Sequence, residues 1–166
     1  MAAMLLAAWT SYTCLLLGLL ASALMAGFFF AYSVSVMRGL DATDPLAAAH
    51  AMRNINALIT TPVFFFGFFG ALVFSLVAAV LVPPRPVMLL TLAGAAVYGL
   101  GAFGVTMAIN VPMNDALAAA TPTAGNAATL WRNYTGPWTR WNHVRTLAST
   151  IAFALLTAAV VVAHQR

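Results

Sequence analysis

Long runs of apolar residues, broken by short polar stretches, make up most of this chain. Four of the runs reach the roughly 20 residues that a helix needs to cross the hydrocarbon core of a bilayer. We expect transmembrane helices at about residues 8–36, 57–82, 87–110 and 140–163. Lipid offers no hydrogen-bond partner to open backbone groups, so each run is expected to be helical. The pattern predicts an all-α protein, a four-helix transmembrane bundle that forms a single integral membrane domain over residues 1–166.

The connections between the expected helices differ in length. The prolines within residues 82–86 predict a tight turn, because successive prolines cannot continue a helix. The other two connections, roughly residues 37–56 and 111–137, are longer, and odd–even counting places both on the same side of the membrane. Inside the first of them, Asp44-Pro45 predicts the start of a short helix, with Asp as its N-cap and Pro in its first turn.

Composition narrows the functional class. Only 6% of the 166 residues are charged, whereas soluble domains devote about a quarter of their residues to charge. Lipid is therefore expected to cover most of the surface, which makes the bilayer itself a partner. The net charge of +4 comes from scattered arginines that form no basic patch, so nucleic-acid binding is not expected. The one cysteine, Cys14, has no partner for an internal disulfide and is expected to pack between helices.

Polar and amphipathic residues gather near one end of the expected bundle, beside the two long connections. Polar groups at membrane depth are costly and usually point into the bundle or a wet cavity. We therefore expect them to line an apolar pocket with a few convergent polar groups, the usual form of a small-molecule site. The candidate substrate-binding residues are Arg53, Asn54, Asn56, Asn110, Asn114, Tyr134, Trp138, Arg140 and Trp141, and the candidate catalytic residues are Asn142, His143 and Arg145. The tryptophans also suit an aromatic belt at the membrane surface.

His143 is the candidate base of this site. Arg140 and Arg145 flank it, and nearby positive charge favours the neutral imidazole, the form that accepts a proton. A closed zinc site needs about four ligands, and the three His, one Cys and three Asp residues show no paired spacing. No metal or organic cofactor is therefore predicted, although a haem or metal remains open.

Several short motifs are specific when taken together. Met-Arg-Asn-Ile-Asn at residues 52–56 is followed by Thr-Pro-Val-Phe at 61–64, Asn-Val-Pro-Met-Asn at 110–114 and Trp-Asn-His-Val-Arg-Thr at 141–146. In this order they resemble the anthrone oxygenase-like family of small membrane proteins, over nearly the whole chain. The resemblance implies a four-helix membrane protein, here in the cytoplasmic membrane of a bacterium. For fungal members it implies oxidation of a polyketide anthrone to an anthraquinone by molecular oxygen, without an evident organic cofactor.

The functional hypothesis is therefore an oxidoreductase, a monooxygenase that oxidises a lipophilic phenolic or anthrone-like substrate with O2. His143 would remove the acidic C–H proton, and Arg145, Asn142 or Asn110 would hold the oxyanion that forms. Three alternatives stay open at this point. In the first, the protein is a non-catalytic module that binds a quinone, lipid or other lipophilic ligand. In the second it is a haem- or metal-binding redox subunit, and in the third it is a structural membrane partner.

Overall fold

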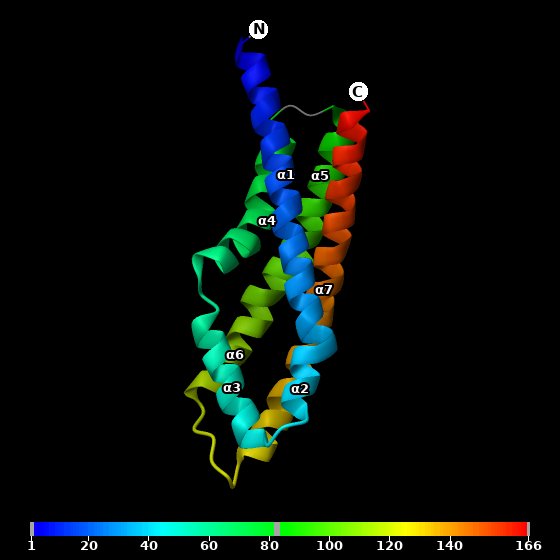
Figure 1. Ribbon diagram of the computed structural model, residues 1–166. Coiled ribbons are helices and arrows are strands. Elements are labelled where there is room, and N and C mark those ends of the chain that lie inside the picture. The colour runs from blue at the N-terminus through cyan, green and yellow to red at the C-terminus, as the bar shows by residue number, and fades with distance from the viewer. Residues whose placement is uncertain (1, 82–83, 166) are drawn as a thin grey trace.

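The computed structural model describes residues 2–81 and 84–165, and within these ranges every regular element is helical. Four long rods form a bundle, in which both chain ends lie at the same end (Figure 1). Each rod contains a helix that is long and apolar enough to cross a membrane, so the chain is an integral membrane protein. In chain order the rods are α1 (Ala2–Ala31) with the π-helical segment η1 (Tyr32–Val36) and α2 (Met37–Asp41); α4 (Pro62–Val80); α5 (Arg85–Tyr98) with the π-helical segments η2 (Gly99–Gly104) and η3 (Thr106–Asn110) and α6 (Val111–Ala119); and α7 (Ala127–His164).

Small residues let the rods approach closely in the half of the bundle that holds the termini. A Cβ atom on Gly18 of α1 would lie 2.7 Å from Oγ of Ser75 in α4. A Cβ atom on Gly101 of η2 would lie 2.5 Å from that of Ala148 in α7. Helices in lipid associate largely through such close packing, so these positions set how near the rods lie.

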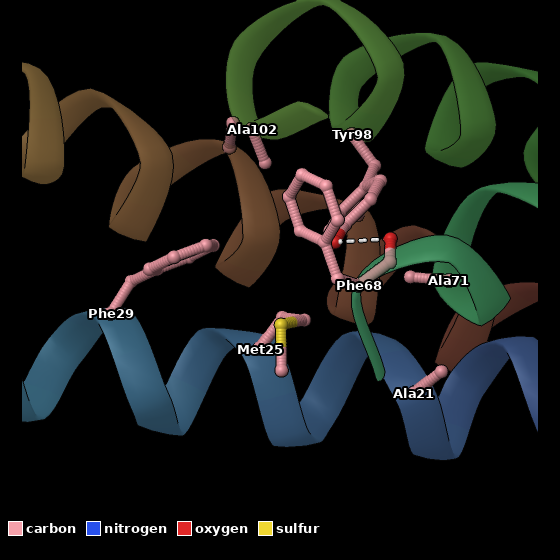
Figure 2. Close-up of a cluster of buried hydrophobic side chains, with 9 residues drawn as sticks. Ala21, Met25, Phe29, Phe68, Ala71, Tyr98 and Ala102 are labelled. Carbon is pink, nitrogen blue, oxygen red and sulfur yellow. Dashed lines mark hydrogen bonds between the residues drawn. The ribbon is translucent and has the colours of Figure 1, made fainter. Parts of the chain in front are cut away.

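A core of larger side chains lies between α1, α4 and the third rod (Figure 2). Met25 and Phe29 project from α1 toward Phe68 of α4 and Tyr98 of α5. The hydroxyl of Tyr98 donates a hydrogen bond to the backbone oxygen of Phe68 over 2.9 Å, drawn as a dashed line in Figure 2. The bond gives a buried phenol the partner that it needs in an apolar setting.

Helix α3 (Pro45–Leu58) lies at the opposite end of the bundle, beside α6 and α7 (Figure 1). The carboxylate of Asp44 accepts hydrogen bonds from the backbone N–H groups of Leu46 and Ala47, over 3.0 and 3.1 Å. The predicted N-cap and short helix are thus confirmed. The chain breaks at residues 59–61, and α4 then starts at Pro62, because Thr61 caps the new helix and proline suits its first turn.

The structure corrects several predicted boundaries. The second spanning helix begins at Pro62 rather than near residue 57. The third continues through Asn110 to Ala119, and the fourth begins at Ala127 rather than near residue 140. Most of the connection expected at 111–137 is therefore helical. Pro137 lies inside α7 without ending it, since a helix held by its neighbours tolerates one missing backbone donor.

The length of α7 shows how the molecule sits relative to a bilayer. Its 38 residues correspond to about 57 Å of helix, whereas the hydrocarbon core of a bilayer is only about 30 Å thick. Part of α7 therefore extends beyond the hydrocarbon. The tight turn predicted at 82–86 falls partly on residues 82 and 83, which lie outside the described residues, and α5 begins at Arg85.

Candidate functional site

A cavity of about 480 Å³ lies between α1, α3, α4, η3, α6 and α7, at the end of the bundle away from the termini. Its volume falls within the usual range of small-molecule sites. Aromatic side chains form much of its wall, and a smaller set of polar side chains interrupts it. The aromatic residues are Phe28, Phe29, Tyr32, Phe64, Phe65, Phe68, Phe69 and Trp138, and the polar ones are Arg53, Asn56, Thr60, Thr106, Asn114, Asp115 and Arg145.

Arg145 is the buried charge of this wall, with only 5% of its surface exposed. Its Cζ atom lies 4.5 Å from the ring centroid of Phe29 and 4.8 Å from that of Trp138. Both rings thus present a face to the guanidinium, an arrangement that attracts a cation electrostatically.

The hydrogen bonds of Arg145 go to neutral oxygens. Nη2 donates to Oδ1 of Asn142 over 2.9 Å, and Nη1 donates to Oγ1 of Thr106 over 3.3 Å. Within residues 2–81 and 84–165, Nε finds no acceptor and no carboxylate pairs with the guanidinium. Burying a charge without a counter-ion is costly. The cavity wall therefore contains a cation that no carboxylate of the described residues neutralises.

Asn142 holds Arg145 in place from behind the cavity wall. It is fully buried, and its Nδ2 donates to the backbone oxygen of Phe29 and to Oγ of Ser33, each over 2.8 Å. Its Oδ1 remains free to accept from Arg145. Asn142 thereby links α7 to α1 and orients the guanidinium, but it is not part of the cavity lining.

Asn114 of α6 fixes the aromatic wall that α7 contributes. Its Oδ1 accepts hydrogen bonds from the hydroxyl of Tyr134 over 2.8 Å and from Nε1 of Trp138 over 2.9 Å. The ring of Trp138 also lies 5.6 Å from that of Tyr32 in η1. Trp138 is thus held from two sides, with one face over Arg145.

The predicted site residues fall into three sets. One set lines the cavity, a second is buried behind its wall, and a third lies on the outer surface. The first set is Arg53, Asn56, Asn114, Trp138 and Arg145; the second is Asn110, Tyr134 and Asn142; the third is Asn54, Arg140, Trp141 and His143. Asn110 is fully buried, and its Nδ2 lies 3.4 Å from the backbone oxygen of Trp138.

The prediction that His143 turns into the shared chamber is wrong. Its side chain is exposed, and its Nδ1 lies 3.0 Å from Oγ of Ser33. The reason is helical geometry, because successive residues are rotated by about 100° around the helix axis. Asn142 and Arg145, three positions apart, share the inner face of α7, whereas His143 lies next to Asn142 in sequence but on an outer face.

Several lining residues were not among the predicted site residues. Phe28, Phe29, Phe64 and Phe68 belong to Phe-rich stretches whose composition alone is typical of helix packing. Asp115 lines the cavity together with Val111, four positions before it, and Ala118, three positions after it, which share its face of α6.

Few side chains around the cavity are of the types that coordinate a metal ion. Within the described ranges, no three His, Cys, Asp or Glu side chains gather in a way that would hold a metal ion. The expectation of a reaction without a bound cofactor stays a prediction.

Comparison with known proteins places the chain in a family. A family model described as anthrone oxygenase matches residues 58–155, a range that includes α4, the whole third rod, and the part of α7 that carries Trp138 and Arg145. Searches of curated proteins and of solved structures found no match. Since the matched range covers more than half of the chain, the protein belongs to the anthrone oxygenase family.

Proposed function

We propose that the protein is a membrane oxygenase that uses O2 to oxidise a flat, lipophilic phenolic or anthrone-like substrate inside the cavity. We assign it to the cytoplasmic membrane of a bacterium. The proposal depends on the surroundings of Arg145. This buried cation has no counter-ion among the described residues, stacks on two aromatic rings and lines an apolar cavity. An anthrone becomes a flat aromatic anion when it loses a proton, and such an anion complements both the charge and the ring faces of this site.

The chemistry can be balanced from the substrate and O2 alone. Loss of a proton from the CH2 group leaves an oxyanion, which the guanidinium of Arg145 would stabilise as a preorganised donor in a dry site. The electron-rich carbon then bonds to O2, and the peroxide anion that forms takes up a proton to become a hydroperoxide. Loss of the second proton from that carbon breaks the O–O bond, forms the new carbonyl and releases hydroxide, which takes up a proton to give water. The substrate supplies all four electrons, so the reaction needs no second reductant.

Asp115 is the group we assign as proton acceptor in place of His143. It is the only carboxylate that the described part of the chain contributes to the cavity wall, and it is exposed, so water can carry the proton away. The other two carboxylates have structural partners. Asp41 accepts hydrogen bonds from Trp131 and Thr135, and Asp44 caps α3.

The proposed activity is tested with the purified protein in lipid nanodiscs. Oxygen uptake and quinone formation are measured with a panel of anthrones and hydroquinones, against empty nanodiscs that report uncatalysed oxidation. With 18O2 we expect one labelled oxygen in the quinone carbonyl and the other in water. An absorption spectrum and metal analysis of the same sample identify any haem or metal. Uptake no faster than in empty nanodiscs for every substrate would leave a binding module instead.

Asp115→Asn tests the assignment of the base. We expect kcat to fall by about 10²- to 10⁴-fold, the usual contribution of a positioned general base, with little change in KM. Asp44→Asn is the matched control, because Asn also caps helices well and residue 44 lies outside the cavity wall. Unchanged turnover in Asp115→Asn would show that another acceptor, such as water, takes the proton.

A further inference from the structure

Part of the cavity wall is also the outer surface of the bundle. Phe65 and Phe69 of α4 and Met107 of η3 line the cavity, yet 42%, 43% and 49% of their respective surfaces are exposed. At these side chains the cavity wall is no more than one side chain thick. These three residues, from two neighbouring rods, form the rim that we call the lateral window.

The break between α3 and α4 explains why the wall is open here. The chain turns at residues 59–61, and this elbow stands out to the side of the bundle in Figure 1. Thr60, within the elbow, lines the cavity and is exposed. Pro62 has no N–H group to continue the hydrogen bonding of α3, and Thr61 caps a new helix at this point, so both residues favour the break before α4.

The window lies at a level suited to lipid. Phe65 and Phe69 belong to the membrane-crossing helix Pro62–Val80, and Met107 belongs to the crossing rod Arg85–Ala119. Apart from the buried Arg145, the charged residues of the cavity wall are Arg53 and Asp115, which lie on α3 and α6, at the end of the bundle beyond α4. The lateral window is therefore apolar, whereas the charged part of the wall is displaced toward the membrane surface.

A row of aromatic rings connects the lateral window with Arg145. The ring of Phe65 lies 6.0 Å from that of Phe64, which lies 5.7 Å from that of Phe28. Phe28 lies 5.6 Å from Phe29, and the ring of Phe29 carries the guanidinium of Arg145 at 4.5 Å. Spacings of this kind are those of interacting rings, so a flat aromatic molecule would meet ring surfaces along the whole path.

We propose that the cavity opens sideways into the bilayer through the lateral window, and that a flat lipophilic substrate enters and its quinone leaves by this route. The proposal rests on the proposed function for the identity of the occupant. Met107 is the adjustable part of the rim, since methionine has three rotatable bonds and adapts to what passes. The substrate class is thereby narrowed to phenolic ketones that dissolve in the hydrocarbon layer.

The test compares Met107→Tyr with Leu100→Tyr in nanodiscs. Leu100 is 79% exposed on the same rod, seven positions before Met107, and does not line the cavity, so it is a matched control. Binding and release of anthraquinone are followed by stopped-flow quenching of tryptophan fluorescence, because Trp138 lines the cavity. We expect Met107→Tyr to slow association and dissociation several-fold with a nearly unchanged Kd, Met107→Ala to speed both, and Leu100→Tyr to match the wild type.

The outcomes separate the two proposals. Equal rates in wild type, Met107→Tyr and Met107→Ala would overturn the lateral window, even if the protein turns over anthrone. Window-dependent binding of anthraquinone without any turnover of anthrone would overturn the oxygenase and leave the window. Absence of anthraquinone binding to the wild type would overturn both.

Discussion

At the end of the bundle that holds the termini, the helices touch through small residues, whereas at the other end the same helices stand apart around bulky rings. Near the termini, Leu15, Ala78, Val87, Leu156 and Ala159 form a closed cluster. At the far end, Phe29, Trp138 and Arg145 surround open space. Close packing stabilises helix association in lipid, and a cavity forgoes those contacts. Close packing thus stabilises the fold in the closed half, whereas hydrogen bonds position the side chains around the cavity in the open half.

The largest expected effect comes from removing the charge of the open half. Arg145→Gln should lower kcat for anthrone oxidation by about 10²- to 10³-fold, the range seen when one oxyanion donor is lost. It should not lower the thermal midpoint in detergent, because it also removes a buried charge that lacks a counter-ion. Arg140→Gln is the control, since Arg140 is exposed and outside the cavity wall. Full turnover in Arg145→Gln would refute the anion site.

A smaller effect is expected when the support of that charge is removed. Asn142→Leu leaves Oγ of Ser33 without the donor from Asn142 and Nη2 of Arg145 without its acceptor. Unsatisfied buried groups of this kind cost about 1–3 kcal/mol each, so the free energy of unfolding, measured by denaturant titration in micelles, should fall. Asn142→Asp instead offers Arg145 a counter-ion, which should raise KM for an anionic ligand. If neither variant changed stability or KM, Asn142 would not position the guanidinium.

The close packing of the rods is probed at one glycine. Gly101→Ala would place its Cβ atom 2.5 Å from that of Ala148, and overpacking of this kind costs about 1–3 kcal/mol. Gly27→Ala in α1 is the control, because within the described part of the chain no atom lies within 4 Å of its added Cβ. We expect a lower thermal midpoint for Gly101→Ala only. Equal midpoints would indicate that η2 and α7 have room for an added methyl group between Gly101 and Ala148.

The smallest effect is expected at His143. Because its side chain lies outside the cavity, His143→Ala should leave turnover unchanged and alter stability by no more than about 0.5 kcal/mol, as is usual for surface changes. Ser33 keeps Asn142 and Thr146 as partners in the variant. Loss of oxygen uptake in His143→Ala would show that the imidazole acts on the cavity through Ser33.

Some parts of the site could be predicted from the sequence, and others could not. Asn142 and Arg145 were expected to turn inward because polarity is costly in lipid, and both are buried. His143 was misplaced because it was expected to turn into the same cavity as Arg145, although its face of α7 is an outer one. The true start of α4 was marked in the sequence by Thr61-Pro62, a capping residue followed by a proline. The continuation of α7 through Pro137 was not, since it depends on the helices around it.

The sequence by itself determined the four membrane-crossing segments, the short helix capped by Asp44 and the inward direction of Arg145. These follow from hydropathy, capping and helical periodicity, which depend on residues close together in the chain. Only the tertiary structure decided that Phe29 and Trp138 enclose Arg145, that no carboxylate from the described residues reaches it, and that Phe65, Phe69 and Met107 border the cavity while remaining partly exposed. Such contacts join residues far apart in the chain, so they depend on how the helices pack against one another.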